Sequence, residues 1–218
     1  MGMMGIEESG IKRADTLIVL DFETTGLSPD MGDRTIEVGA VKLVAGDVVE
    51  RFQALMNPGM RISGFIESYT GISNDMLDSA PPCGEVMADF RAFIGDYNLV
   101  AHNASFDKRF LDAELSRISH TYGGAFGCSL LVSRRLFTAA PNHKLGTLVD
   151  YLNIEAKGSF HRALYDAEMT AKLWIGILYK LRRSYGIDDA PFSLLQKIMK
   201  TPKKSLPSLL ARYSIEYS

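Results

Sequence analysis

Two acidic residues close the first apolar run of the chain. Asp21 and Glu23 stand two positions apart in TLIVLDFE, whose apolar residues predict a strand covered on both faces. Side chains at positions i and i+2 of a strand point to the same face, so two carboxylates should project together past its carboxyl end. Magnesium and manganese prefer such oxygen ligands, although an acidic pair before a turn is more often a solvated strand end.

A second acid, Asp107, lies in the segment HNASFDKRF, directly after a short apolar run. The segment predicts a helix capped by Ser105, which would place Asp107 in the first helical turn. An acid at that position stabilises a helix through its charge alone, and this interpretation is preferred when Asp107 is taken by itself.

His161 and Asp166 form a third cluster in the segment HRALYDAE. Five residues along one helix rotate a side chain by roughly 140°, so the two cannot face one site within a continuous helix. If the helix begins just after His161, the preceding loop can turn the imidazole back over Asp166, which suits a movable general base. The alternative is an exposed histidine before a helix, and Glu168 is expected on a solvated helical face.

Strands and helices alternate after an initial hairpin. Strands at 34–44 and 48–56 flank turn residues at 45–47 and predict an antiparallel hairpin. Later apolar patterns predict short strands at 98–101 and near 126–130, and helices at 73–78, 84–94, 105–118, 130–137, 145–152 and 163–183. This order indicates an α/β domain with a mixed sheet.

The totals are those of an ordinary globular chain of 218 residues, 46% of them apolar and 23% charged. A formal net charge of −2 argues against coating of a duplex, whereas a metal-lined cleft supplies its own positive charge. Cys83 and Cys128 match neither a zinc nor a disulfide pattern. The sequence displays no signal peptide and no membrane-spanning run, so we expect a cytoplasmic protein without membrane contacts.

Three parts are expected along the chain: a disordered N-terminal segment at 1–15, a folded domain at 16–185, and a basic, leucine-containing C-terminal tail at 186–218. Lysines at 197, 200, 203 and 204 lie among prolines in this tail. The preferred interpretation is a solvated tail with one amphipathic turn. The alternative is that residues 197–212 steer the substrate or dock a partner.

The acidic clusters are each weak signals, but their order and spacing are specific. The sequence resembles the DEDDh exonuclease superfamily, in particular proteins like the proofreading epsilon subunit of bacterial DNA polymerase III and the RNase T-like exonucleases. The resemblance rests on DFETTG at 21–26, HNASFDKRFL at 102–111 and HRALYDA at 161–167, and covers about residues 16–180. The gap between His161 and Asp166 indicates the histidine branch of these exonucleases.

This resemblance implies a ribonuclease H-like fold, with a mixed, mainly five-stranded sheet flanked by helices. It also implies two divalent cations, Mg²⁺ or Mn²⁺, with Asp21 as the bridging ligand, and a histidine general base. The residues that match these positions are Asp21, Glu23, Asp107 and Asp166 for the metals and His161 for the base.

Contacts with the terminal nucleotide follow from the same resemblance. The backbone at Thr24 and Gly26 is expected to meet the nucleotide, and Leu27 and Phe106 are expected to pack against its base or sugar. Gly26 should let the chain turn tightly and approach a ligand.

One departure from the family pattern concerns Cys128 and Ser129, which stand where many relatives carry an Asp-Thr pair at a helix start. That acid is not a metal ligand in the family, so the departure leaves the expected chemistry unchanged. It does affect the expected helix cap and the assignment to a subclass. His102 and Asn103 are expected to shape the pocket and stay outside the catalytic set.

The implied activity is metal-dependent 3′→5′ exonuclease cleavage of DNA, releasing nucleoside 5′-monophosphates in proofreading or repair. The expected partner is a single-stranded 3′ end, DNA before RNA, while docking onto a DNA polymerase and formation of a homodimer stay open. One alternative is an exoribonuclease that trims RNA 3′ ends, because the same metal chemistry serves both. A second is a catalytically silent nucleic-acid-binding or polymerase-docking module, which should have lost an acid or the histidine.

Overall fold

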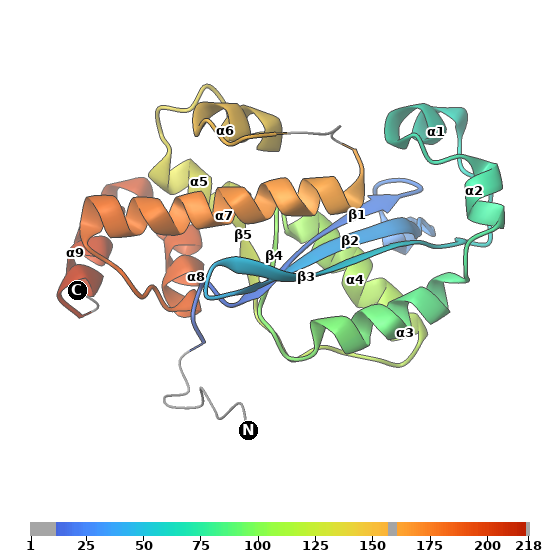
Figure 1. The fold of residues 1–218 in the computed structure, drawn as a ribbon, viewed down its shortest axis with the longest axis horizontal. Helices are drawn as coiled ribbons and strands as arrows, with labels where there is room; N and C mark the ends of the chain where they lie inside the picture. The colour runs from blue at the N-terminus through green and yellow to red at the C-terminus, as the bar shows by residue number, and fades with distance from the viewer. Residues whose placement is uncertain (1–11, 157–160, 217–218) are drawn as a thin grey trace.

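The structure, a computed structural model, describes residues 12–156 and 161–216. Its centre is a five-stranded sheet in the order β3-β2-β1-β4-β5. β1 pairs antiparallel with β2 and parallel with β4, which confirms the predicted mixed sheet flanked by helices (Figure 1). The strands are β1 (Leu17–Thr24), β2 (Thr35–Val44), β3 (Asp47–Leu55), β4 (Leu99–Ala101) and β5 (Phe126–Cys128).

Helices cover both faces of this sheet and extend beyond its two ends (Figure 1). Two short 3-10 helices accompany them, η1 (Pro29–Met31) and η2 (Lys203–Ser205). The α-helices of the described residues are α1 (Gly64–Thr70), α2 (Asn74–Asp78), α3 (Cys83–Ile94), α4 (Ser105–Arg117), α5 (Ser129–Leu136), α6 (Leu145–Tyr151), α7 (Ala163–Tyr185), α8 (Phe192–Lys200) and α9 (Leu206–Glu216).

The predicted hairpin is β2–β3, whose strands pair antiparallel. Ala45 and Gly46 connect them, with φ values of 52° and 87°. Positive φ at both central positions is the mark of a type I′ turn, whose backbone twist matches that of the flanking strands. The hairpin prediction is therefore confirmed.

Alternation along β1 divides its side chains between two cores. Val19 packs with Trp174 of α7 on one face of the sheet. Leu20 and Phe22 pack on the opposite face, which α3 and α4 cover. Since side chains alternate, Asp21 lies on the face that α7 covers, as Val19 does.

Some local predictions need correction. The sequence patterns do not predict α1, which has seven residues. Ser105 is the first residue of α4 and not its cap, because Ala104 holds the cap position without a side-chain hydrogen bond. Ser73 does cap α2 as predicted, since its hydroxyl accepts a hydrogen bond from the Met76 N–H at 3.2 Å.

The C-terminal residues fold against the core, so the prediction of a solvated tail is wrong. Leu194, Leu195 and Ile198 of α8 are fully buried, and Leu210 of α9 joins the same core. Figure 1 shows α8 and α9 at the end of the molecule opposite the start of α7. Their position argues against the alternative in which residues 197–212 steer the substrate.

At the other terminus, Ala14 is fully buried and its carbonyl accepts a hydrogen bond from the Trp174 indole N–H at 2.8 Å. Residues 12–15 therefore belong to the fold, and the remainder of the predicted disordered segment, 1–11, lies outside the described residues. Within the described part of the chain, no helix combines the length and apolar character needed to cross a membrane.

Candidate active site

Three carboxylates meet at the C-terminal end of β1. Asp21 and Glu23 project from β1, and Asp166 approaches them from the first turn of α7. Each of the three can place one oxygen so that all three oxygens lie within 4.8 Å of one another. The structure therefore brings together three of the four acids that the sequence singles out.

The fourth acid, Asp107, lies close enough to this group for its charge to act on Asp21. It sits in the first turn of α4 and is 2% exposed, so it belongs to the interior and not to a solvated helix end. Its Oδ1 accepts a hydrogen bond from the Phe22 backbone N–H at 3.3 Å, between Asp21 and Glu23. This bond ties the start of α4 to the strand that carries the other two acids.

Glu37 fixes the start of α7. It lies on β2 directly across from Glu23 and is fully buried. Its carboxylate accepts hydrogen bonds from the Arg162 guanidinium at 2.8 Å and from the Ala163 backbone N–H at 3.1 Å. Gln53 donates a further bond to Glu37, at 2.9 Å. These donors occupy the Glu37 oxygens. Glu37 therefore supports the acid cluster from behind, and its oxygens are not offered to a metal ion.

Gly39 lets α7 approach the sheet closely at the same place. A Cβ atom on Gly39 would lie 2.0 Å from the Leu164 backbone nitrogen and 2.1 Å from the Ala163 carbonyl carbon. Only a residue without a side chain leaves room for this contact between backbones. The close approach brings the first turn of α7, with Asp166, over the sheet beside β1.

Burial raises the pKa values of all four acids, and repulsion by the other acids adds to it for Asp21 and Glu23. The pKa of Asp21 lies well above its usual value because of burial and then the charges of Asp107 and Asp166. Burial and the charge of Asp166 raise the pKa of Glu23 to about 8. Burial also raises the pKa of Asp107 to about 7 and the pKa of Asp166. The protein's own groups therefore do not compensate four ionised carboxylates at neutral pH.

The donor set fits a hard divalent cation. Asp166 Oδ2 accepts a hydrogen bond from the His161 backbone N–H at 3.0 Å, but its Oδ1 is buried and has no partner among the described residues. A buried polar atom without a partner costs about 1–3 kcal/mol. A cation held by Asp166, Asp21 and Glu23 would satisfy this oxygen and offset the repulsion among the acids.

His161 precedes α7 in a left-handed backbone conformation, with φ of 71°. Its backbone N–H turns back onto Asp166, while its exposed imidazole lies against the ring of Tyr69 from α1, with centroids 4.0 Å apart and planes at 38°. Tyr69 stacks in turn on Phe65, at 5.8 Å. The ring of His161 is thus positioned by α1, an element that the sequence patterns do not predict.

The residues expected to contact the nucleotide are distributed around β1 and α4. Leu27 is 79% exposed, and Phe106 is partly buried on α4. The buried Thr24 donates a hydrogen bond from its hydroxyl to the Gly26 carbonyl at 2.6 Å. A Cβ on Gly26 would lie 2.4 Å from a carboxylate oxygen of Asp33, so the glycine makes room for this side chain. Contacts of these residues with a nucleotide stay predictions.

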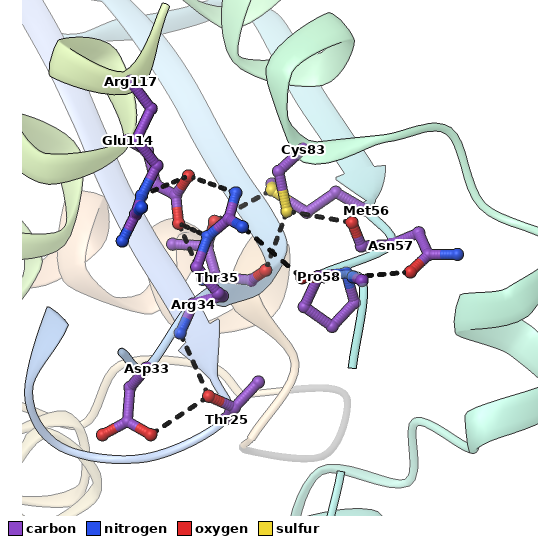
Figure 2. Close-up of polar contacts among 11 residues, drawn as sticks. Thr25, Asp33, Arg34, Thr35, Met56, Asn57, Pro58, Cys83, Glu114 and Arg117 are labelled. Carbon is purple, nitrogen blue, oxygen red and sulfur yellow. Dashed lines mark hydrogen bonds and ion pairs between the residues drawn. The ribbon is translucent and has the colours of Figure 1, made fainter. Parts of the chain in front are cut away.

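Figure 2 shows how the loop between β1 and β2 is anchored. Thr25 donates a hydrogen bond from its hydroxyl to Asp33 at 3.2 Å and accepts one from the Arg34 backbone N–H at 3.0 Å. The Arg34 guanidinium forms a two-pronged ion pair with Glu114 of α4, at 2.7 and 2.8 Å. Glu114 is 2% exposed, which makes the pair rigid. The loop that carries Leu27 is thereby fixed to the helix that carries Asp107.

Comparison with known proteins identifies the family. A family model described as exonuclease matches residues 18–174, which include all four acids and His161. The chain belongs to this exonuclease family. The predicted resemblance to exonucleases is thereby confirmed, and relatives of the chain include DNA polymerase III proteins.

Curated relatives of the exonuclease include much longer proteins. PolC-type DNA polymerase III of Bacillus subtilis is 41% identical over 166 residues, which are 75% of this chain and 11% of that protein. The same polymerase of Oceanobacillus iheyensis is 40% identical over 168 residues, 77% of this chain and 12% of that protein. The chain thus spans about an eighth or less of the length of these relatives.

Solved structures share the exonuclease fold. Exonuclease X in complex with 5′-overhanging duplex DNA has a TM-score of 0.67 and 26% identity, over 84% of this chain and 99% of that chain. The nuclease domain of 3′hExo, a DEDDh family member bound to rAMP, has a TM-score of 0.63 and 23% identity, over 81% of this chain and 96% of that chain. These likenesses confirm the predicted ribonuclease H-like fold.

The Cys128–Ser129 pair of the exonuclease serves packing. Cys128 holds the cap position of α5 without a side-chain hydrogen bond, and its backbone N–H donates to the Met199 sulfur at 3.0 Å. Ser129 is fully buried, with its hydroxyl 2.8 Å from His102 Nδ1. The serine thus fixes a histidine at the end of β4, one of the two residues expected to shape the pocket.

Sequence reasoning missed three residues that position the site of the exonuclease, namely Glu37, Arg162 and Tyr69. Glu37 was detectable as a lone acid in the apolar run TIEVGAV. Arg162 directly follows His161 in the sequence and forms the ion pair with Glu37. Tyr69 and Phe65 lie four residues apart, the spacing of neighbours on a helix.

Proposed function

We propose that this exonuclease hydrolyses DNA in the 3′→5′ direction with two divalent cations, Mg²⁺ or Mn²⁺, in proofreading or repair. The proposal is carried by the convergence of Asp21, Glu23 and Asp166, one oxygen of each lying within 4.8 Å of the others, and by Asp166 Oδ1, which has no partner among the described residues. Such an oxygen-rich group of acids is typical of sites that bind hard cations for phosphoryl chemistry.

Asp21, Glu23 and Asp166 would hold the cations, and Asp107 would act through water. When bound, the cations supply positive charge that activates the attacking water and stabilises the leaving oxygen. The direct hydrogen bond from Phe22 to Asp107 supports a more distant role for that acid, because it already occupies Asp107 Oδ1.

His161 would accept the proton of the attacking water. The water oxygen forms a bond to the terminal phosphorus, the bond from phosphorus to the 3′ oxygen of the preceding nucleotide breaks, and that oxygen takes up a proton. A nucleoside 5′-monophosphate and a strand shorter by one nucleotide result. The exposed imidazole, held at its backbone by Asp166 and at its ring by Tyr69, supports this role.

DNA is the proposed substrate, as a single-stranded 3′ end. Relatives at about 40% identity are DNA polymerase III proteins, and exonuclease X, which has 26% identity, is solved in complex with DNA. Association with a polymerase is part of the proposal, since the chain spans only 11–12% of those relatives.

The test is digestion of matched 5′-labelled DNA and RNA oligonucleotides with Mg²⁺ or Mn²⁺. We expect a ladder that shortens from the 3′ end, faster on DNA, and absent both with EDTA and in Asp21→Asn. Faster digestion of RNA would contradict the DNA substrate and would indicate an exoribonuclease that trims RNA 3′ ends. No cleavage of either strand by clean, folded protein would overturn it in favour of a silent binding module.

A further inference from the structure

A cavity lies at the same edge of the sheet as the acids. Its volume is about 650 Å³. It opens where β4 and β5 end, between the start of α5 and the loop that leads to α6. The lining residues are His102, Asn103, Leu130, Arg134, Asn142, His143, Lys144 and Leu145.

Positive charge dominates this cavity. Arg134 and Lys144 are exposed, and neither side chain has a hydrogen bond or ion pair with the described residues. No Asp or Glu stands among the described lining residues. The chain as a whole carries a net charge of −2, so a cavity whose described lining holds two cations and no acid differs in charge from the rest of the protein. Such a cavity favours an anion.

His102 forms the rigid wall of the cavity. Its Nε2 lies 2.9 Å from the His143 carbonyl oxygen, which can only accept, so Nε2 carries the proton. Its Nδ1 therefore accepts from the Ser129 hydroxyl at 2.8 Å. Burial lowers the pKa of His102 to about 4, which agrees with a neutral ring. This bridge from α5 to the 143–144 backbone fixes the place from which Lys144 extends.

The order of the strands sets the relation between the cavity and the acids. β1, β4 and β5 run parallel and end at one edge, so the order along this edge is acids, then His102 and Asn103 after β4, then α5 with Arg134 after β5. Two inter-strand spacings amount to about 10 Å. A stacked strand with a rise of about 3.4 Å per nucleotide covers that distance in about three nucleotides.

We infer that this cavity binds a backbone phosphate of the nucleic-acid strand, two to three nucleotides upstream of the scissile bond, through Arg134 and Lys144. Asn103, exposed at the mouth with φ of 66°, offers amide donors beside them. The inference rests on the proposed function, because a strand reaches the cavity only when its 3′ end lies at the acids. A free mononucleotide at the acids is too short to reach it.

The test compares Arg134→Gln/Lys144→Gln with the charge-matched control Lys203→Gln/Lys204→Gln, whose lysines lie on η2 and are not among the lining residues of the cavity. Binding of a fluorescent single-stranded dodecamer is measured by anisotropy in the Asp21→Asn background over a salt series. We expect about tenfold weaker binding for the cavity variant. In a plot of log affinity against log salt, the slope of the cavity variant should be less steep by about 0.7, the value for one lost phosphate contact.

Steady-state kinetics on two substrates test this inference separately from the proposed function. The p-nitrophenyl ester of thymidine 5′-monophosphate has only the scissile phosphate, so the cavity variant should cleave it at the wild-type rate. On the dodecamer, the variant's KM should rise about tenfold. Failure of the wild type to cleave either substrate would reject the proposed function, while the binding arm would still decide on the cavity. Wild-type binding by the cavity variant, or an equal loss in the control, would overturn the inference.

Discussion

The imidazole of His161 lies against the ring of Tyr69, with centroids 4.0 Å apart. The two residues come from different parts of the fold, since His161 precedes α7 and Tyr69 lies in the last turn of α1. Burial and then the charges of Glu23 and Asp166 raise the pKa of Tyr69. Tyr69 therefore connects α1 to the proposed base.

Replacing Tyr69 with Ala should lower kcat by up to about tenfold, because an aromatic pair contributes about 0.5–1.5 kcal/mol. Tyr69→Phe keeps the ring and should retain nearly full activity. The measurement is the pH profile of kcat on a single-stranded oligonucleotide for both variants. Equal losses in the Phe and Ala variants would assign the effect to the hydroxyl and not to the ring contact.

Replacing His161 with Ala should reduce turnover by about two to four orders of magnitude, the usual scale for a positioned base. Binding of Mn²⁺, followed by calorimetry, should stay close to that of the wild type, because the side chain of His161 is not among the proposed ligands. If Tyr69 acts through His161, Tyr69→Ala should have no further effect in the His161→Ala background. Full activity of His161→Ala would remove the residue from the mechanism.

Stability without metal should depend on pH in a defined direction. Glu23 has a pKa of about 8 in the folded protein against 4.5 as the ordinary value, so the folded state binds more protons than the unfolded chain between these values. The free energy of unfolding should therefore fall as pH rises across this window. Thermal melts in EDTA from about pH 5 to about pH 8 measure this trend.

Added Mn²⁺ should reverse that trend, because the cation stabilises the ionised acids and binds only the folded protein. The gain in Tm from Mn²⁺ should grow with pH and should be much smaller in Asp21→Asn. A melting temperature in EDTA that rises steadily from acid to neutral pH would contradict the uncompensated acid cluster.

The Glu37–Arg162 pair should respond differently to removal of each partner. Arg162→Ala leaves a fully buried carboxylate without its cation, which costs about 3 kcal/mol, the lower end of the range for a broken buried pair. Glu37→Gln leaves Arg162, whose side chain is 39% exposed and can be solvated, so the loss should be about 1 kcal/mol. Urea unfolding of both variants tests the order, and a larger loss in Glu37→Gln would contradict it.

Gly39→Ala should be strongly destabilising and should reduce activity beyond its effect on folding. A methyl group would collide with the backbone of Leu164, so α7 must shift away from the sheet and carry Asp166 with it. Gly46→Ala is a suitable control, because an added Cβ there meets only the end of the Ile175 side chain, at 3.6 Å, although φ of 87° adds local strain. Mn²⁺ affinity should fall in Gly39→Ala and persist in the control.

Local sequence patterns predict those features that depend on neighbouring residues. The alternation in β1 is sufficient to place Asp21 and Glu23 on one face, and the turn residues predict the β2–β3 hairpin. The meeting of these acids with Asp166 depends on the docking of α7 over Gly39, a long-range contact that periodicity does not encode, and only the resemblance to a family supplied it. Likewise, Leu194, Leu195 and Ile198 carry a helical pattern, but nothing local shows that a distant core will cover them.

The acids of the site come from β1, α4 and α7, segments far apart in the chain. The parallel pairing of β1 with β4 and the docking of α7 on β1 and β2 join residues of large sequence separation, and we expect these contacts to form late because loop closure costs entropy. The site should therefore assemble in the last steps of folding. A nascent or partly folded chain would have its helices and its hairpin but no capacity to cut a strand, so its nuclease activity is withheld until the whole domain is in place.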